Sequence, residues 1–129
     1  MRITIAEILE CEIQGTLIKF KTTFGSGKAI WRSVNNPNVL STYDVEFEVD
    51  GALEWGLHIL PTEVTEYLVA EDGERVVLQG KVEMVGRDGV LVLRVGENLI
   101  LLDTKGEALQ AGSFVRVTVN NVAVYDSNI

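Results

Sequence analysis

The stretch Tyr43–Leu60, YDVEFEVDGALEWGLHIL, begins with strict alternation of apolar and acidic residues. Successive side chains of a β-strand point to opposite faces, so one face of this segment is apolar and the other is acidic. The apolar face carries Tyr43, Val45, Phe47 and Val49 before the Asp50-Gly51 dipeptide, and Leu53, Trp55, Leu57 and Ile59 after it. The stretch therefore predicts a β-hairpin with a concentrated acidic side.

Two loops are compatible with the turn of this hairpin. A three-residue loop keeps the apolar residues on one face, whereas a two-residue Asp50-Gly51 turn would mix the two faces. Because the apolar side must be buried, we prefer the three-residue loop. In that register Glu48 lies opposite Glu54, and two like charges in direct opposition reduce stability. A cation or a basic partner would relieve this repulsion.

The acidic side of the hairpin is the strongest candidate for a functional surface. A solvated sheet face is the ordinary explanation for such residues, and a basic protein partner is the functional one. We disfavour a metal ion, because calcium needs converging oxygen ligands that a flat strand rarely supplies. His58, the only histidine in the sequence, would face Asp44 in this register. The predicted partner-binding residues are Asp44, Glu46, Glu48, Glu54 and His58.

The composition indicates an acidic globular protein. The chain of 129 residues carries 11 basic and 19 acidic side chains, for a net charge of −8. This balance makes nucleic acid an unlikely partner, because a grip on phosphate backbones needs a basic face. No apolar run approaches the roughly 20 residues that span a membrane, the N-terminal residues predict no signal peptide, and the single Cys11 predicts no disulfide scaffold. We expect a soluble cytoplasmic protein without a cofactor.

Most of the remaining sequence predicts strands. Segments 2–13 and 16–23 form the first two. Apolar residues of both parities in the first favour either two buried faces or a bulge near Ala6-Glu7. At the other end of the chain, 114–119 and 122–125 are two short apolar strands separated by Asn120-Asn121, which predicts a closing hairpin.

One segment has the features of a helix. Thr62 is a suitable cap, and Val64, Tyr67 and Leu68 have the spacing of one apolar stripe. We therefore predict a single short helix over 62–72.

The two halves of the chain repeat one pattern. Residues 43–51 match 113–121 in hydropathy and turns, and Trp55 then matches Tyr125. Antiparallel meanders share some likeness in any case, so duplication and coincidence both stay open. We predict an all-β, mainly antiparallel fold of two similar small barrel- or sandwich-like halves packed together, with the short helix between them. The predicted parts are residues 1–61, the connecting helix 62–74, and residues 75–129.

The second half, GKVEMVGRDGVLVLRVGENLILLDTKGEALQAGSFVRVTVNNVAVYD from Gly80 onward, resembles OB-type small barrels. The resemblance rests on a mid-strand glycine, a hairpin, a third strand and a final pair. It lacks the helix between the third and fourth strands, since 103–112 is short for one. The resemblance implies binding of an oligonucleotide, an oligosaccharide or a protein on one sheet face. For such a ligand the candidate residues are Lys19, Lys21, Trp31 and Arg32.

Catalytic patterns are weak throughout the chain. The segment Gly25–Lys28 lacks the earlier glycine and the following Ser or Thr of a phosphate-binding loop. Acidic neighbours of Cys11 oppose a thiolate that could act with His58. Paired carboxylates on open strands provide no cleft for acid–base chemistry. We therefore predict that the protein is not an enzyme.

Our functional prediction is a non-catalytic intracellular binding protein whose acidic hairpin face binds a basic protein. Small acidic inhibitors, such as the immunity proteins that neutralise nuclease toxins, have this general profile, and the comparison is one of class alone. Two alternatives stay open. One is an OB-like module for an oligonucleotide or oligosaccharide, and the other is a β-rich subunit that self-associates through its strand edges.

Overall fold

The computed structural model describes residues 1–13 and 15–128, and in them the chain forms twelve β-strands and no helix. The all-β prediction is therefore confirmed. The strands are β1 (Arg2–Glu12), β2 (Gly15–Thr22), β3 (Gly25–Trp31), β4 (Thr42–Val49), β5 (Leu53–Glu54), β6 (Ile59–Pro61), β7 (Leu68–Asp72), β8 (Arg75–Val85), β9 (Val90–Val95), β10 (Asn98–Lys105), β11 (Phe114–Val119) and β12 (Val122–Asp126).

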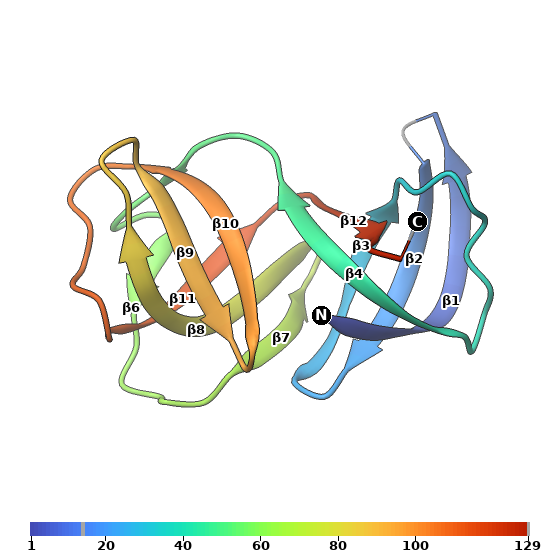
Figure 1. Cartoon of the computed structure of the whole chain (residues 1–129), viewed down its shortest axis with the longest axis horizontal. Helices are drawn as coiled ribbons and strands as arrows, with labels where there is room; N and C mark the ends of the chain where they lie inside the picture. Colours follow the sequence, from blue (N-terminus) through green and yellow to red (C-terminus); the bar gives the residue numbers. More distant parts are fainter. Residues whose placement is uncertain (14, 129) are drawn as a thin grey trace.

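Five strands close into a small barrel, which we call the first barrel (right in Figure 1). β1, β2 and β3 are successive antiparallel neighbours. β12 pairs in parallel with β3 and antiparallel with β4, and β4 returns to β1. The register of β1 against β2 shifts between Ile5 and Glu7. Of the two alternatives for β1, this shift confirms the bulge near Ala6-Glu7. Ile3 and Ile5 before it are buried, whereas Ile8 and Leu9 after it are exposed.

The strands β5, β6 and β8–β11 form the second strand set (left in Figure 1). β8, β9 and β10 are antiparallel neighbours, and β11 lies on the other edge of β8. The segment 53–61 completes the set, because β5 pairs in parallel with β10 and β6 pairs antiparallel with β11. The segment 53–61 therefore borders both edges of the set.

Each of these two groups contains at least one strand from the other half of the chain. β12 follows β11 in sequence but lies in the first barrel, and β5 and β6 follow β4 but lie in the second strand set (Figure 1). Both predicted hairpins are therefore wrong. At Asp50-Gly51 and again at Asn120-Asn121 the chain crosses from one group to the other and does not fold back on the preceding strand.

The predicted helix over 62–72 is also wrong. Residues 62–67 have no regular secondary structure, and β7 pairs antiparallel with β8. β7 also meets β3 in parallel, where Gly25 is the partner of Val69, so it joins the first barrel to the second strand set. Gly25 has a φ of 135°, and a Cβ there would overlap the carbonyl oxygen of Val69. Glycine is therefore required at this junction.

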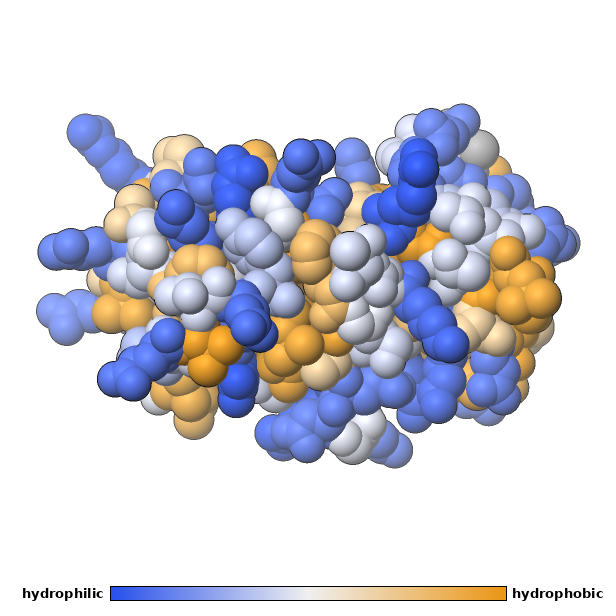
Figure 2. Space-filling model, turned by 90° about the horizontal axis from the view of Figure 1, so that it is seen from below, coloured by the Kyte–Doolittle hydropathy of each residue, from blue (hydrophilic) through white to orange (hydrophobic). Residues whose placement is uncertain are grey.

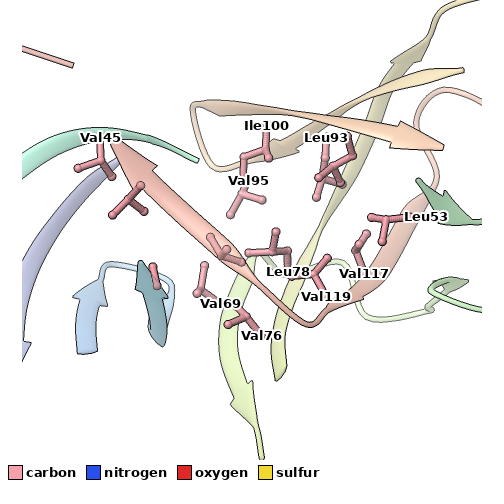
Figure 3. Close-up of a cluster of buried hydrophobic side chains, with 14 of the residues drawn as sticks. Val45, Leu53, Val69, Val76, Leu78, Leu93, Val95, Ile100, Val117 and Val119 are labelled. Atoms are coloured by element: carbon pink, nitrogen blue, oxygen red, sulfur yellow. The ribbon is translucent and has the colours of Figure 1, made fainter. Parts of the chain in front are cut away.

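Aliphatic side chains form one core that extends through both groups of strands. Figure 3 shows part of it, with Val45 of β4 on one side and Leu78, Leu93 and Val117 on the other. All four are at most 1% exposed. Burial of each such side chain contributes about 1.5–3 kcal/mol relative to leaving it in water. The core therefore ties the first barrel to the second strand set.

The surface mixes charged side chains with hydrophobic patches (Figure 2). None of the described residues belongs to a helix that would be long and apolar enough to cross a membrane. Two groups of large aliphatic residues are exposed. On the first barrel they are Ile8, Leu9, Ile13, Val34, Val39 and Leu40, and around the second strand set they are Leu57, Leu60, Val64, Met84, Leu99 and Leu101.

Candidate functional site

β4 carries the predicted acidic face. Val45 is buried in the barrel, whereas Glu46 and Glu48 are exposed, as the alternation predicted. β12 runs along one edge of β4, with Tyr125 beside Glu46 and Ala123 beside Glu48. The glutamates face outward because the apolar residues of the strand pack into the core.

Asp44 lies near the start of the same strand and is already paired. Its Oδ1 accepts a hydrogen bond of 3.1 Å from the Nε–H of Arg2, its cross-strand neighbour on β1. This hydrogen bond holds the pKa of Asp44 below its usual value. Asp44 therefore has a cation within the chain and does not face His58.

Glu54 and His58 lie in and beside the second strand set. The backbone N–H of Glu54 donates a hydrogen bond of 2.9 Å to Nδ1 of His58, and the backbone N–H of His58 donates to the carbonyl oxygen of Glu54. His58 thus closes the turn between β5 and β6. Because β5 pairs with β10, the predicted opposition of Glu48 and Glu54 does not occur.

Residues of β4 and β10 line a groove. These two strands lie where the first barrel faces the second strand set in Figure 1. We call the groove the β4–β10 groove. It consists of two hollows of 450 Å³ and 370 Å³ that share Glu46 and Phe47. The larger hollow is lined by Glu46–Gly51, Val90, Leu101, Asp103 and Tyr125. The smaller is lined by Met1, Val45–Phe47, Glu97–Ile100 and Ser127.

The side chains that line the β4–β10 groove carry charge of one sign, and the terminal amine of Met1 is a positive group beside them in the smaller hollow. Its described lining residues include five carboxylates and no Lys, Arg or His. The five are Glu46, Glu48, Asp50, Glu97 and Asp103. Within residues 1–13 and 15–128, only Asp50 of these has an ion pair, with Arg32 at 3.5 Å. Clefts lined by one sign of charge focus the electric field and attract the opposite charge.

β10 contributes apolar surface to the groove. Leu99 is 54% exposed and Leu101 is 62% exposed, while Ile100 and Leu102 between and after them point into the core. Asp103 continues the outward-facing row. No sequence pattern singled out these three residues, because a run of leucines and isoleucines does not show which parity faces water. The acid that follows the run at Asp103 was the available signal.

Trp31, one of the residues considered for an oligonucleotide or sugar, is 2% exposed. Its Nε1–H donates a hydrogen bond of 2.7 Å to the carbonyl oxygen of Asn35. Its ring packs edge-on against Tyr43, with 4.7 Å between the ring centroids. The indole is therefore a core residue, and its faces are not open for a base or a sugar to stack on.

The three basic residues considered with Trp31 differ in their surroundings. Lys19 lies between Glu7 and Lys28 on the neighbouring strands, and Lys21 is exposed on the same strand. Arg32 bonds Asp50, and a hydrogen bond with Tyr125 contributes most to raising the pKa of Arg32 above its usual value. Arg32 thus lies beside the acidic groove, where it neutralises one carboxylate.

The part of the chain that the structure describes does not bring together the side chains of a metal site or pair Cys11 with His58. No group of three or more His, Cys, Asp or Glu side chains there is placed to hold a metal ion. Cys11 is exposed on β1, whereas His58 is used in the turn after β5. Comparison with known proteins adds no functional information, since no family model, no curated protein and no solved structure matches this chain.

Proposed function

We propose that this is a non-catalytic binding protein whose β4–β10 groove receives a basic surface of a protein partner. The observation that supports this is the charge of the groove, with five carboxylates and no Lys, Arg or His among its described lining residues. Repulsion among these carboxylates falls when a basic partner binds, and the field of the groove steers such a partner inward. The exposed Leu99 and Leu101 supply apolar area beside the charges.

The proposal changes which predicted residues carry the function. Glu46 and Glu48 stay at its centre, and Asp103 and Glu97 of the second strand set join them. Asp44 is a marginal contributor, because Arg2 already neutralises it. A cytoplasmic inhibitor or immunity-type protein is the role we favour, since such proteins cover the basic site of a nuclease with an acidic face.

Two charge-matched variants test the proposal. Glu46→Lys with Glu48→Lys reverses the groove, and Glu63→Lys with Glu66→Lys makes the same change in net charge on exposed residues of the 62–67 segment. Immobilised wild type and both variants are exposed to lysate of the native cell, and retained proteins are identified by mass spectrometry. Each retained protein is then purified, and its affinity for wild type and for the two variants is measured by titration calorimetry. We expect a basic protein that binds wild type and the 63/66 variant but not the 46/48 variant. Equal binding to all three proteins would refute the groove as the site.

The duplication of the chain also stays a proposal. We infer that the second strand set is a second barrel of the same design as the first. In both, three antiparallel neighbours are followed by a fourth strand on the outer edge of the first, and a parallel strand lies beside the third. This shared pairing order supports a common origin of the two halves. The OB-type resemblance, proposed for the second half, then extends to the first barrel, a closed ring of five strands.

Self-association is the alternative with a specific observation in its favour. The exposed aliphatic residues of the first barrel include Ile8 and Leu9 of β1 and Val39 and Leu40 of the following loop. β4 pairs with β1 only at Arg2–Thr4, and the backbone of Ile5 bonds Leu40 and Ser41. In the described part of the chain this edge of β1 therefore has no partner strand only beyond Ile5. Light scattering after gel filtration tests this, since a dimer that Leu9→Lys dissociates would favour it. The oligonucleotide or oligosaccharide alternative has less support, because Trp31 is buried.

A further inference from the structure

The outward positions of β9 and β10 are occupied mainly by aliphatic residues. Val90 and Val92 of β9 alternate with the buried residues of that strand, and Leu99 and Leu101 alternate with the buried residues of β10. An antiparallel sheet with one face in water usually carries polar residues at such positions. Near-continuous apolar runs are typical of strands that are covered on both faces. The core covers the inner face of these two strands, so the sequence of both fits a further cover on the outer face.

The register of the sheet joins these side chains into one surface. Val92 lies opposite Met84 of β8 and opposite Leu101 of β10, so these three form a row across the sheet. Met84 is 55% exposed. Val90 and Leu99 lie on the same side, because side chains two positions apart in a strand share a face. We call these five residues the outer apolar face. None of the described segments is drawn in front of β9 and β10 in Figure 1.

The outer apolar face borders the β4–β10 groove. Val90 and Leu101 line the larger hollow together with Glu46 and Glu48, and Leu99 lines the smaller one. A molecule that covers the outer apolar face therefore meets carboxylates along β4. A second copy of this chain would bring a net charge of −8 and the same carboxylates, which repel those of the first. A basic partner with an apolar surface is complementary to both parts.

The pairing of the strands limits the form of such a partner. β9 pairs with β8 on one edge and with β10 on the other, and β8 pairs with β11 on its second edge. An added strand therefore has no open edge on β8 or β9, and contact with this face must come through side chains. Two strand spacings make the face of β8–β10 about 10 Å wide. This width matches the diameter of about 10 Å of an α-helix with its side chains.

We propose that the outer apolar face binds an amphipathic α-helix of the partner. The apolar stripe of this helix packs on Met84, Val92 and Leu101, and Lys or Arg residues along one flank reach Glu46 and Glu48 of the β4–β10 groove. This inference rests on the proposed function and specifies the form of its partner. Helices with apolar residues at positions i, i+3, i+4 and i+7 present such a stripe, and recognition through it is a recurring mode of peptide binding.

Two synthetic peptides of equal composition test the form of the partner. The first, LKKLLKKLKKLLKK, carries its leucines at helical spacing. The second, KLKLKLKLKLKLKK, carries the same residues in alternation, which is the pattern of a strand. Both have fluorescein at the N-terminus and an amide at the C-terminus. Affinity for the whole protein is measured by fluorescence anisotropy at low salt, and circular dichroism shows whether the bound peptide is helical.

Two pairs of charge-neutral substitutions test the place of binding. Met84→Gln with Leu101→Gln removes apolar area from the outer apolar face, and Val34→Gln with Val39→Gln makes a comparable change on the first barrel. All four side chains are exposed, so both variants should fold. The variant Glu46→Lys with Glu48→Lys and its 63/66 control, described above, test the contribution of the groove.

We expect the helical peptide to gain helix on binding, to bind more tightly than the alternating peptide, and to bind the 34/39 variant as it binds wild type. Its affinity for the 84/101 variant should be about tenfold or more weaker. Equal affinity for wild type and the 84/101 variant, or tighter binding of the alternating peptide, would overturn the helix site. The groove would survive that result if Glu46→Lys with Glu48→Lys still abolishes binding. Equal binding to the 46/48 variant and to the 63/66 control would overturn both proposals.

Discussion

Asn35 and Asp126 are joined by a hydrogen bond of 3.1 Å from Nδ2 of Asn35 to Oδ2 of Asp126, although they are 91 positions apart in sequence. Asp126 is the last residue of β12 and is 9% exposed. Its Oδ1 accepts a further hydrogen bond from the backbone N–H of Asn128, and its own backbone N–H donates to Oγ of Ser33. These contacts fasten the end of β12 to the loop after β3, and so hold the strand in the first barrel.

Replacing Asp126 with Ala should therefore destabilise the protein. The change removes the acceptors of Asn35 and Asn128 at a buried position, for which we expect a loss of about 1–3 kcal/mol in the free energy of unfolding. Urea unfolding followed by tryptophan fluorescence measures it. Asp72→Ala, at an exposed end of β7, is the control and should change stability by less than about 0.5 kcal/mol. Equal effects of the two substitutions would contradict the role of Asp126.

Removing β12 should open the first barrel. A chain that ends at Asn121 lacks the strand between β3 and β4, together with the buried residues Val122 and Val124. We expect a large loss of stability, and partial recovery when a synthetic peptide of residues 121–128 is added in excess, because bound peptide stabilises the folded state by mass action. Circular dichroism melting curves measure both effects. A truncated chain that melts like the full chain would show that the barrel does not need β12.

Gln79 is expected to matter more for stability than the exposed residues of β8. It is 1% exposed, its Nε2 donates to the carbonyl oxygen of Glu66 at 2.8 Å, and its Oε1 accepts from Nη2 of Arg116 at 2.9 Å. Gln79→Leu removes the donor and the acceptor, so we expect about 1–3 kcal/mol of destabilisation. Hydrogen exchange should also accelerate in 62–67, which this side chain holds against β8. Glu83→Leu, exposed on the same strand, is the control for hydrogen exchange in that segment.

Stability should fall in acid through two identifiable carboxylates. Hydrogen bonds from Arg2 and Arg94 lower the pKa values of Asp44 and Glu83, respectively, below their usual values of 3.8 and 4.5. A carboxylate with a lowered folded-state pKa stabilises the fold at pH values above its unfolded-state pKa. That contribution is lost as the pH falls through the folded-state pKa. Urea unfolding between pH 6 and pH 2 measures it.

The double variant Asp44→Asn with Glu83→Gln should show a shallower decline over the same pH range, since neither group then titrates. Both carboxylates are solvent-exposed, so the difference should be small and should shrink as salt is added. A decline as steep as that of wild type would assign the acid sensitivity to other groups.

Local patterns predicted the strands well and their partners poorly. The alternation over Tyr43–Val49 correctly predicted a strand with an acidic outer face. The change of apolar parity near Ala6 left a bulge as one of two alternatives, and the structure contains that bulge. The partner of β4 over Val45–Val49 is β12, whose paired residues follow 73 to 81 positions later in the sequence. No pattern within 43–60 contains that information. Short turns such as Asp50-Gly51 favour a hairpin locally, but tertiary packing overrides that preference here.

The helix and the groove show two other limits. Val64, Tyr67 and Leu68 have helical spacing, but Leu68 enters a strand that β8 stabilises along its length, and the segment before it is held by the buried side chain of Gln79. The groove joins carboxylates from β4 and β10, which belong to different groups of strands. Sequence analysis found those of β4 because they alternate, and it could not bring Asp103 to them without the packing of the two groups.

The exchange of strands has a consequence for how the chain folds and evolves. Residues 1–61 lack β12, the fifth strand of the first barrel, and carry β5 and β6, whose partners lie in the other half. Residues 75–129 carry β12 and lack β5 and β6. Neither half contains a complete set of contacts, so we expect unfolding as one cooperative transition. If the halves did begin as separate copies, the exchange has made them interdependent. Neither can now be lost, transferred or replaced without the other.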